Sequence, residues 1–237
     1  MRIGFALAAV AMLAAAPPGL AAAQDMERVV VTASRIDEDA MRSAPAIYRR
    51  IPADFMLVAV SYQSATRDPG ERKKELETMF IRLKEKAAKN KGYDLSGGTL
   101  GQSTAEIDTV LFTDILQADY SGTGRFTLTL SVDTKEGEPF DRLMKRAEDF
   151  VMTINTAGRA EAYLGDDQFI GARDVTKHRA DLLADITAEV RNLQTQLAPA
   201  KIILTGIENR IVTQPSGPLE LEMFIPYTLT VESGGAE

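Results

Sequence analysis

The sequence contains no cysteine and no tryptophan, and it has a single histidine. The missing thiols exclude disulfides, thiol catalysis, iron–sulfur clusters and thiolate zinc sites. His178 alone cannot form a histidine-rich metal site, and its neighbours Lys177 and Arg179 predict a solvated side chain in a charged turn. Aromatic residues make up only 6% of the chain, which leaves little material for stacking sugars. The fold must therefore be held by an ordinary packed core.

The usual catalytic motifs are also missing. There is no Gly-x-Ser-x-Gly elbow and no looped Asp-x-Asp-x-Asp calcium pattern. Gly97-Gly98 and Gly101 lack a following Gly-Lys-Ser/Thr, so a hairpin-like turn explains them better than phosphate binding. Asp166 and Asp167 could serve a carboxylate-based hydrolase, but they are more simply explained as turn residues between a strand and the third helix. We therefore predict no catalytic residues, no cofactor and no metal site.

The first 23 residues have the three parts of a cleaved secretory signal. Arg2 provides the positive end, residues 3–16 form a short apolar run, and Ala21-Ala22-Ala23 offers small residues for cleavage. An uncleaved membrane anchor is the alternative, although the run is shorter than the ~20 residues that span a bilayer. The sequence thus predicts export, with Gln24 as the first mature residue.

The predicted mature chain is acidic. Removal of residues 1–23 takes away one of the 27 basic residues and leaves all 34 acidic ones. Because such a chain repels phosphate groups, we predict no binding to nucleic acid.

Residues 51–232 alternate between helical and strand periodicities. Helices are predicted from Asp68 to about Gly92, over 139–155 and over 174–197; strands are predicted over 55–62, 110–117, 126–132, 159–164, 201–207 and 219–231. Pro226 should lie at a sheet edge or a bulge, because it has no amide donor. The pattern predicts an α+β fold: a largely antiparallel sheet with two long helices and one shorter helix on one side. We interpret residues 24–50 as a flexible segment and 233–237 as a tail.

In element order, residues 51–231 resemble the SIMPL domain family of exported bacterial proteins. The stretches that carry the resemblance are PADFMLVAVSYQSATRDPGERKKELETMFIRLKEKAAKNKGYDL and FIGARDVTKHRADLLADITAEVRNLQTQLAPAKII. The resemblance implies a non-catalytic body, and some members of the family assemble into ring-shaped oligomers.

A second, local resemblance lies in ERVVVTASR, which is similar to the TonB box of outer-membrane TonB-dependent transporters. In that family the box is captured by an inner-membrane energy-transducing protein, which adds it as a strand to its own sheet. The β-branched residues suit strand addition, and residues 36–50 would act as a linker. The alternative is that residues 28–33 form an ordinary first strand of the domain. The predicted partner-binding residues are Glu27, Val29, Val30, Val31, Thr32, Ala33, Ser34 and Arg35.

The predicted mature chain, residues 24–237 with three amphipathic helices, is too short for the plug and the barrel of about 22 strands that a transporter needs. We therefore expect a non-enzymatic periplasmic protein of a Gram-negative envelope, either free or peripheral to the outer membrane. Its box would dock on a TonB-type energy-transducing protein while the body binds another partner, such as an outer-membrane protein. The alternative is a stand-alone SIMPL-type protein that forms homo-oligomeric rings and is linked to envelope stress.

Overall fold

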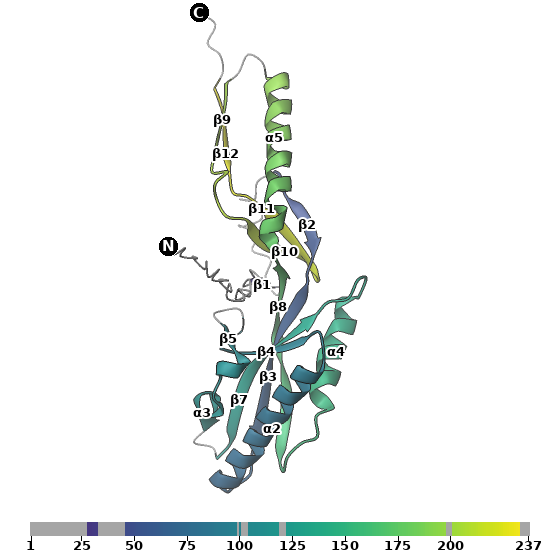
Figure 1. The fold of residues 1–237 in the computed structure, drawn as a ribbon, viewed down its shortest axis with the longest axis vertical. Coiled ribbons are helices and arrows are strands. Elements are labelled where there is room, and N and C mark those ends of the chain that lie inside the picture. Colours follow the sequence, from purple (N-terminus) through teal and green to yellow (C-terminus); the bar gives the residue numbers. More distant parts are fainter. Residues whose placement is uncertain are drawn as a thin grey trace, which may run out of the picture.

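The computed structural model describes residues 28–32, 46–98, 100, 104–118, 122–197 and 201–232. The molecule is elongated (Figure 1). One half contains the largest sheet with its covering helices, and the other contains a single helix beside smaller sheets. The long strand β8 (Ala160–Arg173) runs from the first half into the second.

The largest sheet has seven strands, and its main path follows the order β1-β8-β3-β7-β4-β5. Every pairing in it is antiparallel. The central strand β3 pairs with β7 along its whole length, from Phe55 opposite Asp133 to Ser64 opposite Gly124. The remaining bounds are β1 Arg28–Thr32, β3 Phe55–Ser64, β4 Tyr93–Gly98, β5 Thr104–Glu106, β6 Gln117–Ala118 and β7 Gly124–Asp133.

Two helices cover one face of this sheet, α2 (Pro69–Lys89) and α4 (Phe140–Met152). Helix α2 begins as its sequence predicts: the Asp68 side chain accepts a 2.7 Å hydrogen bond from the Glu71 amide, and Pro69 occupies the first turn. The chain leaves the helix through Gly92, whose φ of 84° favours glycine. The apolar sides of both helices and of β3 and β7 form one buried cluster, which includes Tyr62, Leu83, Phe126, Leu130, Leu143 and Phe150.

The second half of the molecule is built around α5 (Arg179–Gln196), which follows the short 3₁₀ helix Val175–His178. A three-stranded sheet has the order β10-β11-β2, and a two-stranded sheet pairs β12 with β9. Their bounds are β2 Arg49–Pro52, β9 Lys201–Thr205, β10 Val212–Gly217, β11 Glu220–Phe224 and β12 Thr228–Glu232. Leu182 and Ile186 of α5 are buried against Met223 and Ile225, and Arg49 of β2 pairs with Asp185 at 2.6 Å.

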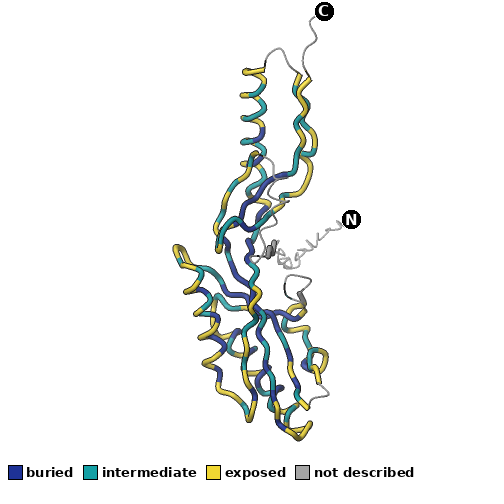
Figure 2. The backbone as a smooth tube through the Cα atoms, turned by 180° about the vertical axis from the view of Figure 1, so that it is seen from behind, coloured by how far each residue is buried: buried dark blue, intermediate teal, exposed yellow. Residues whose placement is uncertain are grey.

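Burial is uneven along the molecule, as Figure 2 shows. The largest buried cluster lies in the half with the seven-stranded sheet. A smaller one, formed by Ala53, Ile170, Ala172, Val175 and Leu221, joins β8 to β11. At the far end of α5 and of the β9–β12 pair, the described residues are half-buried or exposed.

The predicted α+β class and the largely antiparallel pairing are confirmed. The expectation that all three helices share one face is wrong for α5, which packs on β11 and β9 instead. The reason is that β8 extends past the large sheet and delivers the chain to the other half of the molecule before α5 begins.

Several predicted elements also differ in detail. Residues 107–115 contain a 3₁₀ turn and the short helix α3 (Phe112–Ile115) rather than a strand, and the first half of the expected loop over 93–104 is strand β4. The single strand expected over 219–231 is instead two strands, β11 and β12, which are separated by a segment that contains Pro226. Arg49 and Arg50, assigned to the flexible segment, lie in β2.

Candidate interaction site along strand β8

Strand β8 has different neighbours along its two halves. On one side it pairs with β3 from Ala160 to Gly171. On the other side it pairs with β1, but only from Phe169 to Arg173. Within the described part of the chain, residues 160–168 therefore have a strand on one side only. This divided edge is the feature from which the candidate site is built.

A bulge separates the two halves of β8. Val60 lies opposite Leu164 and Val58 opposite Gln168, so Ala59 faces three residues instead of one. At Gly165 an added Cβ would come within 3.1 Å of the Ala59 Cβ, so a larger residue would push the strands apart. Asp166 and Asp167 occupy this bulge and are exposed, rather than lying in a turn before the third helix. The prediction of a turn is wrong because the strand continues through both residues.

The predicted docking segment forms the edge strand β1. Arg28 to Thr32 pair antiparallel with Arg173 to Phe169, with Val30 opposite Gly171. The prediction that these residues are extended is confirmed. Four other predicted partner-binding positions, Glu27, Ala33, Ser34 and Arg35, lie outside the described residues. Residues 28–32 are thus the end strand of the sheet, as the alternative of an ordinary first strand predicts, and their assignment to a flexible segment is wrong.

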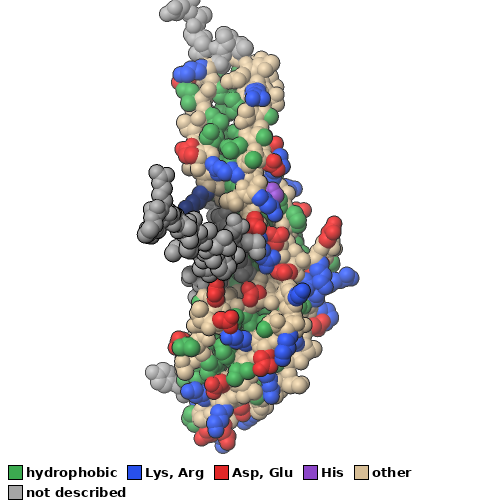
Figure 3. Space-filling model, viewed as in Figure 1, with side chains coloured by type: hydrophobic (Ala, Val, Ile, Leu, Met, Phe, Trp, Pro, Cys, Tyr) green, Lys and Arg blue, Asp and Glu red, His purple; other side chains and the backbone are tan. Residues whose placement is uncertain are grey.

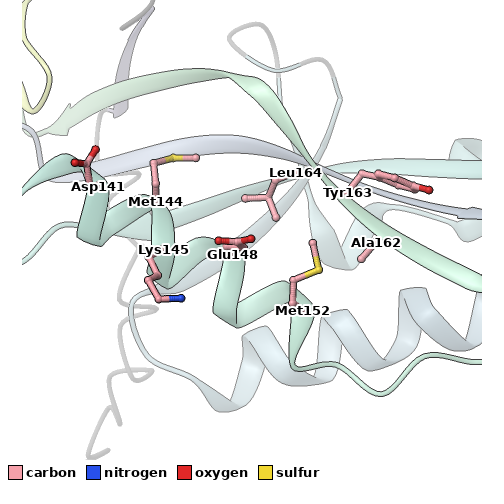
Figure 4. Close-up of a pocket in the computed structure, with 8 residues that line it drawn as sticks. All are labelled: Asp141, Met144, Lys145, Glu148, Met152, Ala162, Tyr163 and Leu164. Carbon is pink, nitrogen blue, oxygen red and sulfur yellow. The ribbon is translucent and has the colours of Figure 1, made fainter.

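The part of β8 before Phe169, residues 160–168, is called its lower half. A groove lies between this half of the strand and α4 (Figure 4). Its volume is about 430 Å³. Leu164 and Met152 point into the space between the two elements, whereas Tyr163 points away from α4. The lining consists of Asp141, Met144, Lys145, Glu148 and Met152 from α4 and Ala162, Tyr163 and Leu164 from β8. Because neighbouring residues of a strand face opposite sides of the sheet, a hollow that contacts three in a row must reach the strand's edge.

Charged contacts hold α4 beside the sheet. Arg146 forms two 2.7 Å hydrogen bonds to the buried Glu138 carboxylate and a third to the Asp133 carbonyl. The hydrogen bond from Arg146, stronger than the opposing desolvation, keeps the pKa of Glu138 below its usual value. On the groove side, Lys145 pairs with Asp149, and their hydrogen bond raises the pKa of Lys145. Tyr163 donates to Glu161, which raises the pKa of the Tyr163 hydroxyl.

The groove was not predicted from the sequence. Helical periodicity places Met144 on the buried side of its helix, and it is half-buried at the groove. Met152 lies outside that apolar stripe and is 51% exposed. An exposed methionine beside a short strand candidate is a weak signal, because only the distance between α4 and the edge of β8 turns these residues into a site.

No other constellation in the described residues suggests chemistry. No group of three or more His, Asp or Glu side chains among them is placed to hold a metal ion. In the same part of the chain, no helix has both the length and the apolar character needed to cross a bilayer. The predicted signal, residues 1–23, lies outside the described residues.

Comparisons with known proteins identified no protein similar to this chain. Protein-family models, curated proteins and solved structures all gave no match to this chain.

Proposed function

We propose that this chain is an exported, non-enzymatic interaction protein of the Gram-negative periplasm. Its N-terminal strand would dock on a TonB-type energy-transducing protein, while the body binds another envelope partner. The observation that supports this most directly is the position of β1, an edge strand that pairs with one neighbour only. Strand addition to a partner would replace the main-chain hydrogen bonds that β8 now provides with bonds of the same kind.

Release of β1 from β8 for capture by a partner should cost only a modest free energy. Release of β1 breaks one five-residue ladder and the contacts between β1 and β10, whereas β3, β7 and β8 remain paired with one another. Each intramolecular hydrogen bond contributes a net of only about 1 kcal/mol, and water solvates the released groups. A partner whose sheet offers a ladder of similar length, together with specific side-chain contacts, could therefore take β1 from β8.

A single proline tests this proposal. Val30→Pro removes an amide from the middle of the segment, so we expect it to weaken capture by a purified C-terminal domain of a TonB-type protein at least tenfold. Val30→Thr keeps a β-branched residue and should bind like the parent. The melting temperature of Val30→Pro should fall by no more than ~5 °C, since only an edge strand is lost.

Binding by biolayer interferometry and melting by circular dichroism would be measured on the mature protein. Capture of Val30→Pro with undiminished affinity would contradict docking through this strand. A collapse of the melting temperature would instead assign the segment to the core.

A second function, self-association, is supported by the far end of α5. Beyond the buried Ile186, the apolar residues Val190 and Leu193 are half-buried, and Leu197 is 45% exposed. The β9–β12 pair beside them leaves Val231 44% exposed, and Figure 3 shows hydrophobic side chains gathered over this end. A two-stranded ribbon and one helix cannot bury such a stripe by themselves. A second copy of the chain would cover it.

Sedimentation velocity of the mature protein tests self-association. We expect a concentration-dependent oligomer that Leu197→Glu converts to a monomer, because the charge would have to be buried at the contact. Leu111→Glu is the matched control, since Leu111 is 63% exposed and lies at the start of α3, away from α5. A monomer at every concentration would contradict this second function.

A further inference from the structure

Among the described residues, no strand pairs with residues 160–168 of β8 on the side away from β3. In an antiparallel sheet, alternate residues direct their amide and carbonyl groups to one side or the other. On the side away from β3, β1 stops opposite Phe169, so residues 160–168 have no strand partner there within the described residues. The Ala160 amide donates to the Ala157 carbonyl at 3.0 Å. The main-chain groups beyond it on this side form a template for an added strand.

The groove gives the added strand a place for its side chains. A peptide paired with Ala160–Leu164 would direct every second side chain toward α4, over Met144, Met152 and Leu164. The volume of about 430 Å³ lies within the range of ligand pockets. Flexible methionine side chains adapt to apolar groups of different shapes. An extended segment with apolar residues at alternate positions therefore fits this face.

The acidic side chains around the groove favour an occupant with a positive charge. Asp141 and Glu148 line it from α4, and Glu161 lies on the adjoining strand. Asp166 and Asp167 follow at the bulge, while the single lining cation, Lys145, is already paired with Asp149. Two β8 edges brought together would place these acidic groups near one another, which disfavours a second copy. Lys or Arg residues on the added strand would be attracted instead.

We propose that the groove between α4 and the lower half of β8 binds an extended, basic segment of another protein by strand addition. This site is separate from β1, which pairs on the other side of the bulge. It also requires no release of β1. The site therefore gives the body a binding surface that operates whether or not the N-terminal strand is captured, and its test does not depend on the TonB proposal.

The test uses a fluorescein-labelled alternating Lys-Val heptapeptide and the mature protein at 0.15 M salt, where long-range attraction is screened. We expect saturable binding by fluorescence anisotropy. A peptide with the same charge and a central proline should bind at least tenfold more weakly, because it cannot complete the ladder. Hydrogen exchange should slow at the amides within residues 161–164 that face away from β3 when the first peptide binds.

A charge reversal locates the site. Glu148→Lys should weaken binding of the Lys-Val peptide by about five- to tenfold, because an attraction between exposed charges becomes a repulsion. Glu77→Lys makes the same change of net charge at an exposed position of α2 and should leave binding unchanged. Equal binding of the proline peptide, equal loss in both variants, or protection outside residues 160–164 would overturn the proposal. Self-association through β8 that excludes the peptide would also overturn it.

Discussion

Replacement of Arg146 by Ala is expected to lower the free energy of unfolding by about 3–5 kcal/mol. The Glu138 side chain is only 3% exposed, and both of its oxygens accept from Arg146 at 2.7 Å. Without the guanidinium, this carboxylate stays buried and unpaired, and the Asp133 carbonyl loses a donor. Urea denaturation followed by circular dichroism would measure the loss. Arg146→Lys should recover only part of it, because an ammonium cannot form the bidentate contact.

The stability lost in Arg146→Ala should be smaller at acid pH than at neutral pH. The folded-state pKa of Glu138 lies below the ordinary value of 4.5. The stabilisation from this pair is therefore complete above pH 4.5 and declines as the pH falls through the folded pKa. The difference between the parent and Arg146→Ala should be constant near neutrality and should shrink in acid.

Lys145→Ala is the matched control, because Lys145 and Asp149 form an exposed pair on the same helix. Its melting temperature should stay close to that of the parent. If Arg146→Ala were as stable as Lys145→Ala, the pair between Arg146 and Glu138 would not anchor α4.

The contacts of Arg146 also bear on the proposed peptide site, because Arg146 and its neighbour Lys145 have different roles on α4. Arg146 fixes α4 to the end of β7, while Lys145 lines the groove. The width of the groove depends on where α4 lies against β8. A loosened α4 would therefore weaken peptide binding even though no groove residue had changed.

The parts of the fold that the sequence predicts well have strong local signals. Helix α2 has a capping Asp68, a proline in its first turn and a regular apolar stripe, and β7 alternates from Phe126 to Val132. These patterns determine the element type without any knowledge of its neighbours. For Pro226 the sequence predicts only a position at a sheet edge or a bulge, and it does not predict the gap between β11 and β12 around this residue.

The other parts depend on contacts between distant residues. Gly165-Asp166-Asp167 is typical of a turn, yet these residues lie in a strand because β8 pairs with β3 on both sides of the bulge. The apolar residues near Val110 suggest a strand, but Phe112 packs against Phe80 and Phe126 in a short helix. The candidate groove could not be predicted, because it depends on where α4 lies relative to the edge of β8, and local sequence patterns carry no information on that distance.

In the docking that we propose, β1 leaves β8 and pairs with the partner through the main-chain groups that now face β8. Those groups cannot form both ladders at once. Pairing within the molecule would therefore compete with capture, and the affinity of the partner would report how readily β1 is released. Because the chain has no cysteine, a disulfide between two introduced cysteines can hold β1 in place without side reactions.

The most direct test is a lock between β1 and β8. Thr32 and Phe169 are register partners, so Thr32→Cys combined with Phe169→Cys should join the two strands on oxidation. We expect the oxidised protein to lose capture by the TonB-type C-terminal domain at least tenfold, and reduction to restore it, while either single variant binds like the parent. Capture of the verified intramolecular disulfide form with parental affinity would contradict the account.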